Sequence, residues 1–371
     1  MRPLLSLCMI VKNEEGTLQR AISSVKEVVD EIVVVDTGSV DRTVEIARGL
    51  GARVYSHTWQ DDFSLARNES IRHANGRYIL WMDADDVVPK EEICKLSRLK
   101  KTLKKLPKDA YYFRLVNPME GEETQVCMHL RIFPKLPGVL FEGAIHEQVI
   151  PSLQKSGCRE VYTDITIQHS GYHTTEEVRH KARRNLRILL KSTEQEPENY
   201  YYIMHLGFTY STLGEYDQAK RYFKIVMECQ NPDVRKKRWF PFASICYAIR
   251  NRDDGDIEIA ESVLSKLLRD FPEHGYARFL LGEIYYSRGE VESSLHYLSD
   301  LTEDDLRFVV AIPTRKLIFR KHFLLGQCYQ KMGRFQEAEH EYQNCLRMSP
   351  DSIEVMLALK DLYMDIIDIA K

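Results

Sequence analysis

Three carboxylates stand within four residues of one another, directly after an apolar run. Acids this close disfavour one another's charged form unless a cation offsets them. Hard divalent ions such as Mg²⁺ and Mn²⁺ prefer oxygen ligands of this kind and commonly share them with the phosphates of a substrate. A cap at Asp86 for a helix that begins near Pro89 would explain only one of the acids. The cluster of Asp83, Asp85 and Asp86 therefore predicts a site for a metal ion and a phosphate.

A fourth acid, Asp36, ends a second apolar run and enters a tight turn at Gly38. Ser39 or Asp41 can cap the helix that follows, so capping does not require Asp36. A carboxylate at this place is suited to accept a hydrogen bond from a ribose hydroxyl or a base N–H. The sequence contains neither the glycine-rich fingerprint of dinucleotide-binding proteins nor that of P-loop NTPases, which disfavours dehydrogenases and kinases.

Both sites stand in a region, up to residue 116, where short apolar runs alternate with helical patterns. Runs such as Ile32–Val35 are apolar on both faces, which only a strand covered by helices above and below tolerates. We therefore expect an α/β domain with a mostly parallel, doubly wound sheet whose ligands bind beyond the carboxyl ends of the strands. The expected strands are 4–11, 31–36, 52–55, 78–83 and 111–116, and the expected helices are 16–25, 41–49 and 63–73. We expect antiparallel strands over 124–172 and a connecting helix over 176–190.

From about residue 200 the strand signals end and paired helices follow, marked by glycines that recur at irregular intervals. Four glycines suit the turn within a pair, and a small residue five positions later lets the second helix approach closely. These are Gly214 with Ala219, Gly255 with Ala260, Gly289 with Ser294, and Gly333 with Ala338. Three glycines lie seven residues earlier, and three prolines are expected to close units: Gly207, Gly282 and Gly326, and Pro232, Pro272 and Pro350. The pattern predicts an all-α domain of degenerate tetratricopeptide-like hairpins.

The last segment, residues 351–371, is expected to form a capping helix of this helical array. One face of that helix would carry Val355, Leu359, Leu362, Tyr363, Ile366 and Ile367. The apolar residues left over could instead bury a contact between two copies of the chain, and these are Met356, Leu357 and Met364.

Composition bounds the class of protein. The chain has 371 residues, 44% hydrophobic and 29% charged, as in ordinary folded proteins of two or three domains. With 52 Lys and Arg against 55 Asp and Glu, the net charge is −3, so we expect no nucleic acid partner. No segment approaches the ~20 apolar residues of a membrane span, and the apolar opening is too short for a signal peptide. Eight cysteines without a C-x-x-C pair indicate a reducing compartment, and we expect a cytoplasmic protein.

Four segments resemble, in order and spacing, the motifs of the family 2 glycosyltransferases of the GT-A fold. They are Leu5–Glu14, Val33–Asp41, Ala66–Asn68 ahead of Gly76, and Asp83–Asp86. With its helical repeats, the chain is similar to a subgroup that joins this domain to tetratricopeptide repeats and includes bacteriocin peptide S-glycosyltransferases. We therefore expect a nucleotide-sugar-binding glycosyltransferase domain at 1–173, a connecting helix at 174–198 and the repeats at 199–371.

The resemblance implies an inverting transfer of a sugar, a hexose or N-acetylhexosamine, from a nucleoside diphosphate sugar. A UDP-sugar is the expected donor, although Thr37 stands where many relatives carry a second acid. Carried over by position, Asp36 contacts the nucleotide base, Arg67 the diphosphate or the base, and Asp83 the ribose. Asn13 and Glu14, in the first motif, are counted with these nucleotide-binding residues.

The resemblance also implies a Mn²⁺ or Mg²⁺ ion on Asp85, together with Asp86, bridging the two phosphates. A metal and an arginine would neutralise the charge that grows on the leaving diphosphate without proton transfer. A late histidine, His169, resembles one that holds this metal in the family, with His146 or His173 as alternatives.

The segment 141–147 resembles the part of the family that supplies a base for the acceptor. Glu147 is the candidate and Glu142 the second choice. A base must reach the attacking hydroxyl and needs a raised pKa.

Three functions follow for the whole chain. The first is transfer to a peptide or protein acceptor that the repeats present, with homodimerisation through the repeats as a further possibility. The second keeps the chemistry but uses a lipid or polysaccharide acceptor. The third is a repeat adaptor with an inactive transferase domain, which the retained acids disfavour. Basic runs at 98–105, 179–187 and 235–238 are expected to be solvated helix faces, although 179–187 could meet a phosphate or an acidic acceptor.

Overall fold

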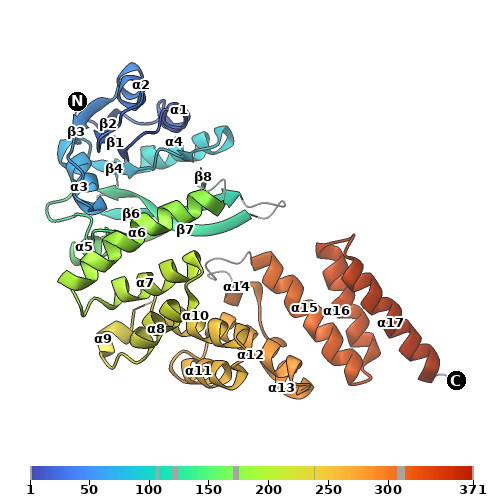
Figure 1. The fold of residues 1–371 in the computed structure, drawn as a ribbon. Coiled ribbons are helices and arrows are strands. Elements are labelled where there is room, and N and C mark those ends of the chain that lie inside the picture. The colour runs from blue at the N-terminus through green and yellow to red at the C-terminus, as the bar shows by residue number, and fades with distance from the viewer. Residues whose placement is uncertain are drawn as a thin grey trace. The chain divides into compact units, whose positions relative to one another are not determined.

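The structure, a computed structural model, describes residues 2–105, 108–118, 124–169, 175–237, 239–306 and 314–369. Its internal contacts divide the chain into two compact units, Met1–Pro197 and Glu198–Lys371 (Figure 1). The first unit holds the sheet, and the second consists of helices. The helix that the sequence suggests as a connector belongs to the first unit by its contacts.

Within the described residues, eight strands form one sheet in the order β3-β2-β1-β4-β7-β6-β8-β5. The half from β3 to β4 is parallel. Beyond it, β7 runs antiparallel to β4 and β6, and β8 runs parallel to β6 and antiparallel to β5. The sheet is therefore mixed, and it is parallel where strands and helices alternate in the sequence. The strands are β1 (Leu5–Val11), β2 (Glu31–Asp36), β3 (Arg53–Ser56), β4 (Tyr78–Trp81), β5 (Asp86–Val87), β6 (Asp109–Pro118), β7 (Thr124–Pro134) and β8 (Arg159–His169).

The helices of the first unit follow the predicted pattern closely. They are α1 (Leu18–Val25), α2 (Thr43–Gly49), α3 (Phe63–His73), α4 (Ile93–Thr102) after a 3₁₀ turn at Lys90–Glu92, α5 (Ile150–Lys155) and α6 (Thr175–Gln195). The bounds of α3 match the prediction because Asp62 caps it, accepting a hydrogen bond from the Leu65 amide at 3.1 Å.

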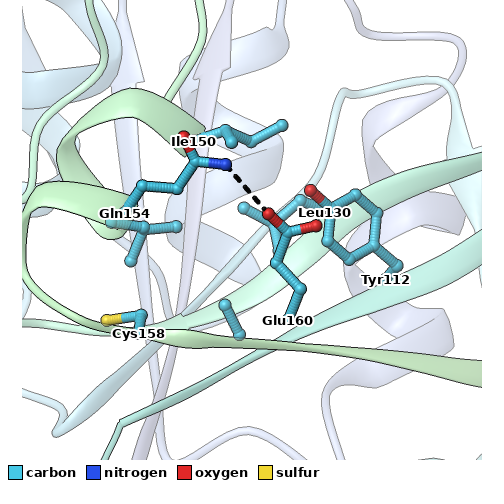
Figure 2. A pocket seen from close by; sticks show the side chains of 8 residues that line it. Tyr112, Leu130, Ile150, Gln154, Cys158 and Glu160 are labelled. Carbon is cyan, nitrogen blue, oxygen red and sulfur yellow. Dashed lines mark hydrogen bonds between the residues drawn. The ribbon is translucent and has the colours of Figure 1, made fainter. Parts of the chain in front are cut away.

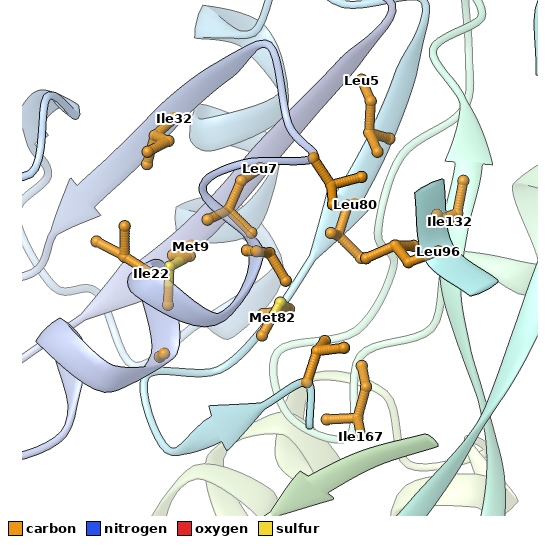
Figure 3. Packing of buried hydrophobic residues seen from close by; sticks show 14 of the residues in the cluster. Leu5, Leu7, Met9, Ile22, Ile32, Leu80, Met82, Leu96, Ile132 and Ile167 are labelled. Atoms are coloured by element: carbon orange, nitrogen blue, oxygen red, sulfur yellow. The ribbon is translucent and has the colours of Figure 1, made fainter. Parts of the chain in front are cut away.

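Helices cover both faces of the parallel strands, as their doubly apolar sequences predict. In β1, Leu7 and Met9 enter a cluster with α1 and α4, whereas Cys8 enters a second cluster with α3 and α5. Figure 3 shows the first cluster, to which Met82, in the middle of the acidic segment, and Ile167 of β8 both contribute. The packed core therefore fixes the two segments that carry the candidate metal ligands.

The second unit consists of helix pairs followed by a single long helix. Its helices are α7 (Tyr200–Leu213), α8 (Tyr216–Met227), α9 (Pro232–Arg235), α10 (Phe240–Asp253), α11 (Ile257–Asp270), α12 (Gly275–Ser287), α13 (Val291–Leu298), α14 (Glu303–Leu306), α15 (Thr314–Lys331), α16 (Phe335–Met348) and α17 (Ile353–Ile369). The pairs α7/α8, α10/α11, α12/α13 and α15/α16 are the predicted hairpins.

Glycines shape these hairpins in two ways. The four turn glycines have φ between 71° and 91°, a region that side chains with a Cβ rarely adopt. The inner glycines lie against the second helix: a Cβ on Gly207 would stand 2.7 Å from the Phe223 ring, and one on Gly326 would stand 2.6 Å from Tyr342. Both sets of glycines are therefore needed for the helix pairs to pack.

Two details of the second unit differ from the sequence prediction. Pro232 begins α9 instead of closing a unit, whereas Pro272 and Pro350 do follow the ends of α11 and α16. In α17, Val355 and Leu362 are buried, but the predicted face does not continue. Leu362 is the last buried residue of this helix, and Tyr363, Ile366 and Ile367 beyond it are exposed.

Among the described residues, we find no helix with the length and hydrophobicity that a bilayer crossing needs.

Candidate active site

The acidic cluster lies at the end of β4, in the tight turn that leads into β5. The predicted strand 78–83 is two residues too long, because β4 ends at Trp81. Met82 and Ala84 are buried in the core and hold the turn in place. Asp86 caps no helix, since the next helical turn begins at Lys90 without a side-chain cap. The helix-cap interpretation of Asp86 is therefore wrong.

The pairing of β5 with β8 brings His169 to the acids. In this antiparallel pair Asp86 stands opposite His169, and their side chains meet, with Nδ1 of the ring 2.8 Å from Oδ1 of Asp86. The Oδ1 atom of Asp85 lies 3.4 Å from the same nitrogen. Possible ligand atoms of Asp83, Asp85, Asp86 and His169 all lie within 4.8 Å of one another. This spacing and these oxygen and nitrogen donors fit a single divalent cation.

Two of the three acids are paired with buried arginines. Arg67 of α3 donates to Oδ1 of Asp83 at 2.9 Å, and Arg131 of β7 lies 2.9 Å from Oδ2 of Asp86. Burial alone would raise the pKa of Asp83, but the charges of Arg67 and Arg131 outweigh it and hold the pKa well below its usual value.

Asp85 lies in a different electrostatic environment. Burial raises its pKa, and the charges of Asp83 and Asp86 add to the effect against the opposing attraction of His169. A cation at the cluster would therefore stabilise the charged form of Asp85. The pKa of Glu14, in the loop after β1, is raised for the same reasons: burial raises it, and the charges of Asp85 and Asp83 add to this.

The pKa of His169 is also raised, but the cause differs. Burial alone would lower its pKa, but the hydrogen bond to Asp86 and the charges of Asp85 and Asp83 outweigh burial and raise it. The ring is therefore held by carboxylates on the side of Nδ1.

Arg67 connects the acidic cluster to the candidate base. Its guanidinium is 9% exposed and forms ion pairs with both Asp83 and Glu147. Burial disfavours the charged guanidinium, but the two carboxylates outweigh burial and raise the pKa of Arg67. Glu147 is thus placed beside the cluster, whereas Glu142 is half exposed and lies 3.4 Å from the surface residue Lys155.

The sequence analysis assigned no role at this site to Arg131 or Trp81. Arg131 is 1% exposed, and both its guanidinium and that of Arg67 lie over the Trp81 ring, at 4.1 and 4.3 Å. The Trp81 indole N–H donates to the Leu130 carbonyl at 2.7 Å. A charged residue between Leu130 and Ile132, in an otherwise apolar stretch, is the signal that could have identified Arg131.

The loops after β1 and β2 lie side by side and are joined by hydrogen bonds. Asn13, at φ 56°, accepts from the Val40 amide, and its own amide donates to the Ser39 hydroxyl, both at 2.9 Å. Asp36 accepts from the amides of Gly38 and Ser39, so this acid also stabilises its turn, a role that the sequence reasoning missed. Asp36 remains at the carboxyl end of β2, at the same edge of the sheet as the acidic cluster.

Neither alternative histidine is found among the possible metal ligands of the described residues. His146 has φ 52°, and burial, together with Arg184, lowers its pKa to about 4. It does not join the cluster of possible metal ligands among the described residues. His173 lies outside the described residues.

A small pocket elsewhere in this unit is separate from the acidic cluster. It lies between α5 and the strands, and Figure 2 shows Gln154 donating to Glu160 at 3.1 Å among its lining residues. None of the residues that line it belongs to the acidic cluster.

Comparison with protein families matches both parts of the chain. Residues 6–139 match Glycosyl transferase family 2. Residues 200–227, 248–304 and 319–352 each match a tetratricopeptide repeat family. These segments cover the parallel sheet with the acidic cluster and three stretches of the helical array.

Two curated relatives match large parts of the chain. A TPR repeat-containing protein of Synechococcus elongatus is 32% identical over 69% of this chain and 63% of its own length. The SPbeta prophage-derived glycosyltransferase SunS of Bacillus subtilis is 29% identical over 60% of this chain and 53% of its own length. The chain thus spans between about half and two thirds of these relatives. Among solved structures, S. aureus TarS has 14% identity and a TM-score of 0.41, over 67% of this chain and 53% of that one.

Proposed function

We propose that this chain, in which a family 2 glycosyltransferase domain precedes tetratricopeptide repeats, transfers a sugar with inversion from a nucleoside diphosphate sugar to a peptide or protein. The observation that carries the proposal is the acidic cluster at the carboxyl end of β4, where Asp85 has a raised pKa beside His169. A site that gathers three carboxylates and a histidine within ligand distance of one another is suited to a cation, which in turn binds a diphosphate.

The nucleoside is assigned to the edge formed by the loops after β1 and β2. Asp36 would accept from the base, and Asp83 would accept from a ribose hydroxyl. Asn13 and Glu14 border the same edge, where the hydrogen bonds between the two loops give it a fixed shape. We propose a UDP-sugar as the donor.

Asp85 and His169 would hold the cation, Mn²⁺ or Mg²⁺, with Asp83 and Asp86 close by. When bound, such an ion neutralises the charge that develops on the leaving diphosphate. Arg67 would support the same charge, because its buried guanidinium already faces the cluster.

Glu147 is the proposed base. The acceptor O–H or S–H attacks the anomeric carbon, the bond from that carbon to the phosphate oxygen breaks, and its electron pair stays on the diphosphate. The acceptor proton passes to the Glu147 carboxylate. In the structure Glu147 is paired with Arg67, so we propose that the donor's diphosphate draws Arg67 away and frees Glu147 for the acceptor.

The repeats are proposed to present the acceptor. Arrays of helical hairpins form extended surfaces that suit peptide segments, which favours a peptide or protein over a small acceptor. The exposed apolar residues Met356, Leu357 and Met364 of α17 support a contact with a second copy of the chain.

Donor hydrolysis tests the proposal most simply. The purified chain is incubated with UDP-glucose, UDP-N-acetylglucosamine or GDP-mannose and Mn²⁺, with and without a peptide pool, and released nucleoside diphosphate is measured. We expect release from one donor that EDTA abolishes and a peptide increases. Absence of release from every donor, with and without peptides, contradicts the proposal.

A further inference from the structure

We propose that Asp86 is a positioning residue: Arg131 holds it, and it in turn fixes the His169 ring through Nδ1, which assigns the other ring nitrogen, Nε2, to the cation. This inference rests on the proposed function, because it concerns how the same site is built. It also separates two adjacent acids that the sequence treats alike. Asp86 orients the histidine, with its Oδ1 atom 2.8 Å from Nδ1. Oδ1 of Asp85 stands farther from the same nitrogen, at 3.4 Å, and is assigned to the cation.

Both carboxylate oxygens of Asp86 are held by protein groups. Its Oδ2 atom accepts from the backbone amide of Asp83 at 2.9 Å and lies 2.9 Å from Nη1 of Arg131. Its Oδ1 atom lies 2.8 Å from Nδ1 of His169. Oδ2 therefore has two protein partners and Oδ1 has one, so protein groups already hold both oxygens of Asp86.

Asp86 is also more deeply buried than Asp85 and His169. The side chain of Asp86 is 0% exposed, whereas those of Asp85 and His169 are 19% and 16% exposed. A hydrated cation that arrives from solvent meets the exposed groups first. Dehydrating an ion to reach a carboxylate that is already ion-paired is unfavourable.

Arg131 explains why Asp86 stays in place. The guanidinium is almost fully buried, on β7, and it also lies over the Trp81 ring at 4.1 Å. Removing one partner of such a buried pair leaves an uncompensated charge, so each holds the other. Arg131 thus acts on the metal site through Asp86, without touching the cation itself.

The backbone completes the arrangement. Asp86 and His169 are directly opposite in the antiparallel pair of β5 and β8, and Val87 faces Gln168 in the next position. Strand pairing fixes the distance between the two Cα atoms, and the hydrogen bond fixes the rotation of the ring. In metal-bound histidines, the ring nitrogen that does not bind the metal commonly donates its N–H to a carboxylate, which sets the tautomer. Asp86 is placed for this role.

The most direct test uses the unmodified chain. Histidine ring nitrogens are labelled with ¹⁵N, and His169 is identified by comparison with His169→Gln. Zn²⁺ and UDP are then added in mildly alkaline buffer. We expect the Nε2 signal to shift and Nδ1 to keep its proton. A shift at Nδ1, with the proton lost from that nitrogen, would overturn the proposal.

Variants provide the second test, with Mn²⁺ binding in the presence of UDP as the readout. Asp85→Asn should abolish binding, whereas Asp86→Asn and Arg131→Lys should weaken it about 10–100-fold, the usual cost of losing a supporting residue. Asp164→Asn, at an acid of β8 that is 76% exposed, is the matched control and should bind as the unmodified chain does. Circular dichroism shows whether each variant is folded, and the labelled unmodified chain decides the matter if one is not.

The outcomes separate this inference from the proposed function. If the unmodified chain binds no Mn²⁺ with UDP or GDP, the proposed function fails. If it binds Mn²⁺ and Asp86→Asn binds equally well, or loses binding as completely as Asp85→Asn, only the positioning role of Asp86 fails.

Discussion

The two units of this chain treat charge in opposite ways. The first buries Arg131 and Asp86 together and gathers two more acids and a histidine around them. Among the described residues of the second unit, both partners of every ion pair stay at least partly exposed. Arg252 and Arg320, for example, both pair with Glu283.

We infer that the difference is one between the proposed reaction site and a helical scaffold. Burying an ion pair adds little to stability, since desolvation offsets most of the attraction. The buried cluster of acids, arginines and a histidine is therefore the part of the chain for which we propose a ligand. In the repeats, the helices meet through glycines and buried apolar side chains.

Asp85→Asn should produce the largest effect on the first unit. We expect sugar transfer to fall about 1,000-fold, as for loss of a group that stabilises developing charge. The free energy of unfolding should stay equal or increase, because the raised pKa shows that the charged form is disfavoured in the folded state. Transfer assays and thermal unfolding check both. Loss of stability together with activity would make the cluster structural.

Phe223→Ala should break the second unit instead. Phe223 is fully buried against Gly207, and its truncation is expected to cost about 3–4 kcal/mol of the free energy of unfolding. Denaturant unfolding should show this loss, while donor hydrolysis stays unchanged. Ile225→Ala, at a 40% exposed position on the same helix, is the control and should cost far less. Hydrolysis that falls with Phe223→Ala would show that the units are not independent.

Glu147→Gln tests the proposed base. Transfer should fall about 100-fold, in the range expected for loss of a general base, whereas Mn²⁺ binding with UDP should persist. Glu142→Gln, beside Lys155 at the surface, should change neither transfer nor stability. If Glu142→Gln is the inactive variant, the two candidates must be exchanged.

Gly214→Ala should produce the smallest effect. Nothing lies within 4 Å of an added Cβ, so the cost of about 1–2 kcal/mol comes only from φ 85°. Gly214→Asn should be milder, because asparagine tolerates this region. Thermal unfolding of the two variants measures the difference, and equal stability of alanine and glycine would contradict the backbone explanation.

Local patterns predicted most of the fold. The bounds of α3 and β2 agree with the sequence because a cap and an uninterrupted apolar run mark them. The end of β4 did not, since Met82 continues the apolar pattern into the turn. The order of the strands beyond β4 depends on contacts between distant segments, and local periodicity does not report these.

The candidate site was predicted in part. Clustering of acids in the sequence pointed to Asp83–Asp86, and the structure places His169 and Glu147 beside them. The arginines that partner the acids come from α3 and β7, and the pairing of Arg131 with Asp86 spans 45 positions. Such a pairing has no local signature, so the different roles of Asp85 and Asp86 became visible only in three dimensions.

Calorimetric titration of Mn²⁺ into the chain saturated with UDP tests the central claim most directly. The account predicts one Mn²⁺ site in the unmodified chain that Asp85→Asn removes, while the variant remains folded. Equal binding of Mn²⁺ by the unmodified chain and Asp85→Asn would contradict it.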